Sequence, residues 1–253
     1  MITVFPIRKV QQLRRAAVRA CSVSREGPEG WSKSEVDPMN LLAVFSALRI
    51  KRGFILRAYL FREGGNGNGV VWALPEDVGF PEPEACLEAI QNQTELPPPD
   101  GFPAYLPGPP VPPQAQANIM DAIEGDATPW SYLSASIFAR EAGEFGAMWH
   151  GCEWSTHAIL GADPWTPQRA KRRERTHDEP TGSMADWKWL LAKPSEWRPS
   201  VEQSDDTTTV RFFTYTGLRP ESIHHHTDRF KRGSYRFDSA DEVMAKGPGG
   251  YIF

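Results

Sequence analysis

The stretch His150–His157, HGCEWSTH, places two histidines, a cysteine and a glutamate within eight positions. On a helix, His150, Glu153 and His157 would share one face and could ligate zinc or iron. On a strand, Glu153 and His157 would lie roughly 13 Å apart, at about 3.3 Å per residue, which is too far to bind one metal ion. The chemistry of this stretch therefore depends on its local structure.

Composition favours a strand over residues 145–160. Glycines at 146, 151 and 161 disfavour a helix, whereas tryptophan, cysteine and threonine are common in sheets. Side chains alternate along a strand. The alternation predicts two groups, with His150, Cys152 and Trp154 on one face and Trp149, Glu153 and His157 on the other. Glu153 and His157 become the candidate acid–base pair, and Cys152 with His150 as its base is an alternative nucleophile.

A second group of histidines lies in Ile223–Phe230, IHHHTDRF. On a strand, His224, His226 and Asp228 share a face, with His225 opposite. Two histidines and a carboxylate can form an open metal site, provided that a neighbouring strand adds a ligand. The candidate metal ligands are therefore His150, His224, His226 and Asp228; the residues specify neither which metal nor any other cofactor.

Tryptophan is concentrated in the second half of the chain. Six of the nine tryptophans lie between Trp149 and Trp197. Aromatic side chains beside ionisable ones are typical of ligand cavities. We expect such a cavity, lined by Trp149, His150, Trp154, Trp187, Trp189 and Phe213, with Glu153 or His157 as a further polar anchor.

Local signals define the elements that would position these residues. Helical spacing of apolar residues predicts helices at 6–21, 37–50, 82–92, 114–124 and 129–142, with Asp37 and Thr128 as N-caps. Two β-rich runs around a glycine-asparagine loop predict a hairpin over 53–75. Further strands are expected at 145–160, 185–192, 208–216, 222–230, 234–238 and 250–253.

These elements indicate an α+β fold with N-terminal helices and a large antiparallel sheet. The order of the C-terminal strands is similar to an up-and-down barrel of the lipocalin kind, a likeness of architecture alone. A lone hairpin is marginal in water, so we expect hairpin 53–75 to join this sheet. Residues 1–253 would then form one domain with a proline-rich strap at 97–113; the alternative is a helical and hairpin unit at 1–96 beside a barrel-like domain at 114–253.

Composition limits the functional classes. Apolar residues make up 40% of the chain, charged residues 24%, and the formal net charge is −4. The basic run at 169–179 lacks interleaved aromatic residues, so we expect no nucleic-acid partner. No apolar run reaches the length of about 18 residues that spans a bilayer, so we expect no membrane partner. Three widely spaced cysteines favour a reducing, cytoplasmic environment.

The function expected from these patterns is binding of an apolar or aromatic small molecule in the cavity of the C-terminal sheet. The alternative is an enzyme, either metal-dependent or acting through Glu153 and His157. A second alternative is an interaction module that presents the proline-rich strap to a partner.

Overall fold

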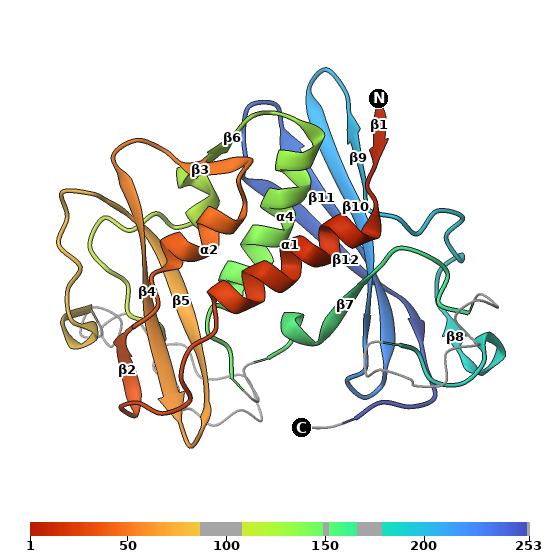
Figure 1. Cartoon of the computed structure of the whole chain (residues 1–253), viewed down its shortest axis with the longest axis horizontal. Helices are drawn as coiled ribbons and strands as arrows, with labels where there is room; N and C mark the ends of the chain where they lie inside the picture. The colour runs from red at the N-terminus through yellow and green to blue at the C-terminus, as the bar shows by residue number, and fades with distance from the viewer. Residues whose placement is uncertain (87–107, 149–151, 166–178, 252–253) are drawn as a thin grey trace, which may run out of the picture.

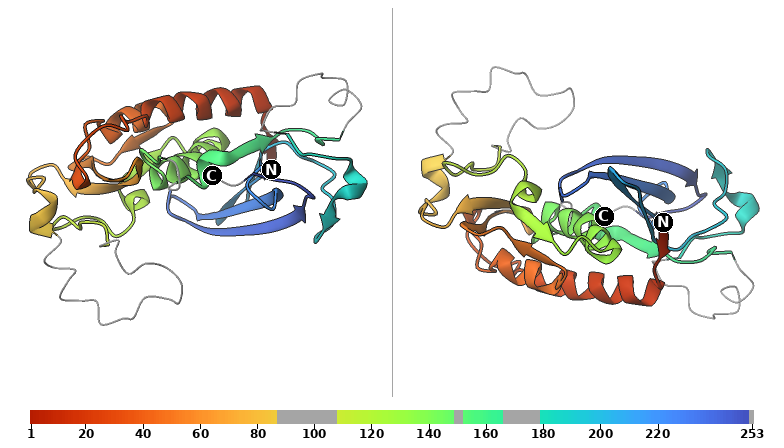
Figure 2. Two further views of the ribbon diagram at one scale, coloured as in Figure 1. Left: turned by 90° about the horizontal axis from the view of Figure 1, so that it is seen from below. Right: turned by 90° about the horizontal axis from the view of Figure 1, so that it is seen from above.

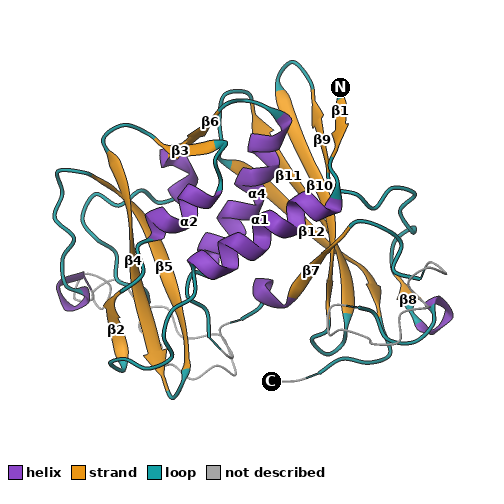
Figure 3. Ribbon diagram, viewed as in Figure 1, coloured by secondary structure: helices purple, strands orange, loops and turns teal. Residues whose placement is uncertain are grey.

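A computed structural model of the chain describes residues 1–86, 108–148, 152–165 and 179–251. Its architecture is α+β, with a large antiparallel sheet on one side, a small sheet on the other and helices between them (Figures 1 and 3). None of the described helices combines the length and the hydropathy that crossing a bilayer requires.

Seven strands form the large sheet, in the order β1-β9-β10-β11-β12-β8, with β7 also paired to β10. Their bounds are β1 Ile2–Val4, β7 His157–Leu160, β8 Lys188–Trp189, β9 Ser200–Gln203, β10 Thr207–Thr216, β11 Ser222–Lys231 and β12 Phe237–Lys246. The strand β10 changes partner along its length, since its first half pairs with β9 and its second half with β7. This change of partner brings β7, and with it His157, beside the histidines of β11.

The sheet curls through 182°, which makes it a half-barrel and not the closed barrel that the strand order suggests. Closure would require the two edges of the sheet to pair with each other. The edge strands are too short for that, because β1 supplies three residues and β8 only two.

The hairpin over 53–75 forms as predicted but does not join the large sheet. Its strands are β4 (Phe54–Glu63) and β5 (Asn66–Pro75), and Gly64 and Gly65 close it with φ values of 56° and 80°. Its third strand is β2 (Gly30–Lys33), which pairs with β4. The prediction missed β2 because four half-buried residues carry no periodic signal.

Helices fill the space between the two sheets (Figure 2). They are α1 (Ile7–Ala20), α2 (Pro38–Val44) and α4 (Pro129–Gly143), with Asp37 and Thr128 as side-chain caps of the last two. The helix α4 is buried around most of its circumference and contacts β5, β9, β10, α1 and α2. One apolar core accordingly runs from Phe5 to Tyr235 through the hairpin, α4 and the large sheet.

Two predicted helices are shorter than expected. The segment 37–50 ends its helix at Val44 and continues as β3 (Leu48–Ile50). The segment 114–124 contains only a 3₁₀ turn, η1 (Ile119–Ala122), before β6 (Ile123–Gly125). Since β3 and β6 pair with each other, long-range pairing outweighs the local helical spacing at both places.

Candidate functional site

Three histidines converge on the face of the large sheet that packs against α4, here called the helix face. His157 lies on β7, and His224 and His226 lie on β11. The ring centroid of His157 is 4.8 Å from that of His224 and 6.0 Å from that of His226. The alternation along β11 places His224 and His226 together and His225 on the opposite face, as the spacing predicts.

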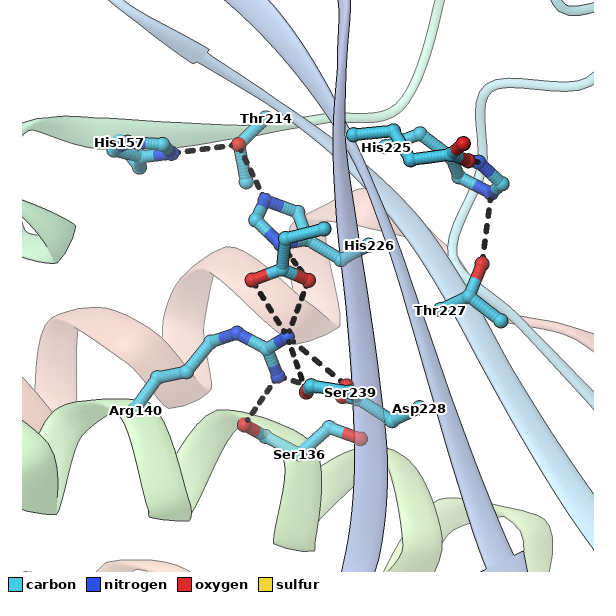
Figure 4. Close-up of polar contacts among 11 residues, drawn as sticks. Ser136, Arg140, His157, Thr214, His225, His226, Thr227, Asp228 and Ser239 are labelled. Atoms are coloured by element: carbon cyan, nitrogen blue, oxygen red, sulfur yellow. Dashed lines mark hydrogen bonds and ion pairs between the residues drawn. The ribbon is translucent and has the colours of Figure 1, made fainter.

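A threonine links two of these imidazoles. The hydroxyl oxygen of Thr214, on β10, lies 2.7 Å from His157 Nδ1 and 2.8 Å from His226 Nε2 (Figure 4). Thr214 is fully buried, and His157 and His226 nearly so. The other nitrogen of His226, Nδ1, lies 2.9 Å from Asp241 Oδ1 on β12, an ionic contact whose angle does not meet the geometry of a hydrogen bond.

Asp241 is held as a carboxylate, although partial burial raises its pKa. The neighbouring His226 and the guanidinium of Arg140 lower the pKa of Asp241 to about 2. A lone pair on His226 Nδ1 would be repelled by this carboxylate oxygen at 2.9 Å, so Nδ1 carries the proton.

The proton on His226 Nδ1 fixes the direction of the hydrogen bonds that run through His226 and Thr214 to His157. His226 Nε2 must then accept from the Thr214 hydroxyl, and the Thr214 oxygen must accept from His157 Nδ1–H. His157 Nε2 is left with the lone pair. We call this sequence of groups, Asp241–His226–Thr214–His157, the histidine chain.

Arg140 of α4 anchors the histidine chain to the helix. Its guanidinium donates to both carboxylate oxygens of the fully buried Asp228, at 2.6 and 3.0 Å, and to Asp241 at 3.0 Å. The two carboxylates raise the pKa of Arg140 against the effect of its burial. Asp228, a predicted metal ligand, is therefore committed to an ion pair.

The histidines are neutral at pH 7. Burial, reinforced by the neighbouring His224, His226 and Arg14, lowers the pKa of His157 to about 3. Burial also lowers the pKa values of His224 and His226. A neutral imidazole donates one hydrogen bond through its N–H and accepts one at its other nitrogen.

The stretch before His157 is a turn and not the predicted strand. Both carboxylate oxygens of Glu144 accept from the backbone N–H groups of Glu153, Trp154 and Ser155. These bonds hold the 3₁₀ turn η3 (Trp154–Thr156), and among the described residues of 145–160 the named strand is β7, His157–Leu160. Trp154 consequently packs on His157, with ring centroids 5.7 Å apart, and does not point away from it.

The predicted site residues thus separate into several groups. Trp154, His157, His224 and His226 come together on the helix face, whereas Trp187, Trp189 and Phe213 belong to an aromatic cluster on the opposite face of the sheet. The side chain of Glu153 is exposed, and Glu153 and His157 do not form a pair. Trp149 and His150 lie outside the described residues.

The aromatic cluster on the opposite face is tightly interlocked. Trp165 packs edge-on against Trp187 and Trp189, at 5.2 and 5.9 Å between ring centroids, and Trp197 packs on Phe213 at 5.4 Å. The Trp187 indole N–H also donates to the Thr181 carbonyl. These contacts are those of a second core.

Three further hypotheses from the sequence concern Cys152, the metal site and the proline-rich strap. Cys152 is half-buried and lines a cavity of about 210 Å³ with Cys21, whose thiol pKa is raised to about 12 by burial and by the charge of Glu141. Within the described part of the chain, no three histidine, cysteine or acidic side chains are arranged to hold a metal ion. The proline-rich strap at 97–113 lies outside the described residues up to residue 107.

Sequence reasoning did not find Thr214, Asp241 and Arg140. Each joins the site only through strand register or helix packing, which a single strand pattern does not reveal. No family model matches the sequence, and no curated protein or solved structure matches it.

Proposed function

We propose that the protein binds a small molecule with a flat apolar body and one hydrogen-bond donor, against His157 and His224 beside Trp154. The observation that carries the proposal is the fixed direction of the histidine chain, which ends in an acceptor lone pair on His157 Nε2. His224 is half-buried and more exposed than His157, so the ligand approaches from its side.

The depressed pKa of His157 favours binding over acid–base catalysis. A general base works best when its pKa is near the working pH. An imidazole with a pKa of about 3 takes up a proton poorly at pH 7, yet it accepts a hydrogen bond from an N–H or O–H group. The Trp154 ring, 5.7 Å from His157, supplies an aromatic surface for the apolar body.

The direction of the hydrogen bonds in the histidine chain can be tested first by NMR of the histidine side-chain nitrogens. We expect both His157 and His226 to be protonated on Nδ1 at pH 7. In Thr214→Val, which keeps the shape but removes the hydroxyl, His157 should lose this single tautomer. Protonation of His157 on Nε2 in the unaltered protein would contradict the proposed direction.

Binding is tested with indole as the probe and 1-methylindole, which lacks the donor, as its match. We expect indole to shift the side-chain nitrogen signals of His157 and His224 saturably, and 1-methylindole to bind about tenfold more weakly, as loss of one partner of a buried hydrogen bond implies. His224→Asn should weaken indole binding, whereas His225→Asn, one residue away on the opposite face, should not.

Two results would overturn this proposal. One is the absence of any saturable shift at His157 and His224 with indole. The other is a saturable response to zinc at the same two imidazoles, lost in His224→Asn and kept in His225→Asn, since that result would favour the metal-dependent alternative.

A further inference from the structure

The outer edge of β5, remote in sequence from the histidine chain, bonds to other segments on both sides of Val71. Gly67 accepts from the Met148 N–H at 2.7 Å, and the Gly69 N–H donates to the Phe145 carbonyl at 2.6 Å. Further along, the Ala73 carbonyl accepts from the Gln116 N–H at 2.9 Å. None of these three partners belongs to a strand of the same sheet, so this edge takes up backbone from other segments.

Val71 lies between these occupied positions. Alternate residues of a strand direct their peptide groups to the same edge, so the N–H and C=O of Val71 point the same way as those of Gly69 and Ala73. No residue of the described ranges bonds to either group. Val71 is only 6% exposed, and buried backbone groups are almost always paired.

A cavity of about 350 Å³ lies beside Val71. Most of its lining side chains are apolar, and Asn118 adds a polar one. The apolar ones come from four elements: Val70 and Val71 of β5, Ile119 and Met120 of η1, Ala139 and Ala142 of α4, and Phe237 of β12. No lining residue carries a charge. The volume is near the small end of the range of about 300–1,000 Å³ that ligand pockets span.

We propose that this cavity binds a short, uncharged, apolar peptide segment in an extended conformation. One residue of the peptide exchanges two hydrogen bonds with Val71, its N–H donating to the Val71 carbonyl and its carbonyl accepting from the Val71 N–H. The peptide thereby extends the sheet β2-β4-β5 by one short strand, a recognised mode of peptide binding. Small apolar side chains of the peptide contact Ala139, Ala142 and Phe237.

Absence of charge in the walls decides the class of segment. A lysine, arginine or acidic side chain would lose its hydration without gaining a partner of opposite charge, so such residues are excluded from the bound stretch. The same chemistry is offered by a free peptide with its charged ends outside the cavity and by an internal segment of a partner protein.

The test uses the full chain and N-acetyl-alanyl-valyl-alanine amide as the probe, with the Val71 amide followed by ¹H–¹⁵N NMR. We expect a saturable downfield shift of the Val71 amide proton. Methylation of the valine nitrogen removes the donor to the Val71 carbonyl and should weaken binding about three- to tenfold. Methylation of the neighbouring C-terminal alanine nitrogen, which points away from β5 when valine pairs with Val71, is the matched control and should weaken binding less.

A cavity-filling variant tests the location. Ala139→Leu places three extra carbon atoms in the cavity and should abolish saturable binding without lowering the unfolding temperature. Ala16→Leu on α1, which does not line the cavity, should bind as the unaltered protein does. A tripeptide with free ends that binds as well as the capped one would identify free peptides as the source, and binding of the capped one alone would identify an internal protein segment.

The proposal is overturned if the capped peptide produces no saturable shift at Val71. It is also overturned if the two methylated peptides bind equally, or if Ala139→Leu and Ala16→Leu bind equally. None of these measurements involves His157 or His224, so their outcome is independent of the function proposed above.

Discussion

The two faces of the large sheet are built by alternate residues of the same strands, yet they differ in chemistry. On the helix face, Thr214 and His226 belong to the histidine chain, which Arg140 links to α4 through Asp241. On the opposite face, their neighbours Phe213 and His225 stack on each other with ring centroids 4.8 Å apart. A shift of one residue along the chain therefore exchanges a hydrogen-bonded environment for an aromatic one.

The difference between the two faces indicates which face tolerates substitutions better. A buried polar chain is stable only while each member keeps its partner, because an unpaired polar group in a low dielectric is costly. Aromatic stacking loses contact area gradually and leaves no unpaired charge. We therefore expect equal substitutions to have unequal effects on the two faces.

The largest effect is expected for Arg140→Met. It removes the partner of Asp228, whose side chain is 0% exposed, and should lower the free energy of unfolding by about 3–5 kcal/mol. Arg211→Met on β10 is the matched control on the opposite face. The side chains of Arg211 and Glu202 are each over 40% exposed, so their ion pair should contribute about 0–1 kcal/mol to the free energy of unfolding.

Urea unfolding at pH 7 measures both variants. The double variant Arg140→Met with Asp228→Leu should recover most of the loss, since it leaves no buried charge at position 228. If Arg140→Met and Arg211→Met lower the free energy of unfolding by the same amount, charge burial does not explain the difference between the two faces.

The next effect is a loss of stability in mild acid. The pKa of His157 is about 3 in the folded protein, against about 6.5 in an unfolded chain. Between these pH values the unfolded chain binds more protons than the folded protein. The contribution of His157 to folding stability is therefore complete above pH 6.5 and falls as the pH drops toward 3. At about 1.4 kcal/mol per pH unit, His157 accounts for roughly 2 kcal/mol between pH 6.5 and pH 5.

Urea unfolding of the unaltered protein and His157→Asn at pH 7 and pH 5 isolates this contribution. The slope with pH should be smaller in the variant. Asp241 does not interfere, because its lowered pKa affects stability only below about pH 4. Parallel slopes for the two proteins would mean that His157 is not held neutral by the fold.

Sequence patterns were sufficient where neighbours along the chain determine the structure. The strands predicted at 208–216 and 222–230 and the helix predicted at 129–142 match β10, β11 and α4 within one residue at each end. Alternating apolar residues and the Thr128 cap act locally, so a single sequence reveals them.

Sequence patterns did not predict the structure where residues far apart in the chain determine it. The strand β12 was predicted at 234–238 but runs over Phe237–Lys246, because its exposed acidic stretch gives no alternation. The turn at Trp154 depends on the Glu144 side chain, nine to eleven positions away. The histidine chain combines four residues from four strands, so only strand register could have joined them.

The smallest effect is expected from His225→Asn. His225 is half-buried, stacks on Phe213, and lies 3.8 Å from the exposed Glu242, so its replacement should cost less than about 1 kcal/mol. His226→Asn, at the adjacent position, removes the partner of the Thr214 hydroxyl and should cost about 1–3 kcal/mol. Unfolding of the two variants at pH 7, where both imidazoles are neutral, compares hydrogen bonding with stacking at one place in the sheet. A loss for His225→Asn as large as that for His226→Asn would show that the aromatic face, and not the polar chain, specifies this part of the fold.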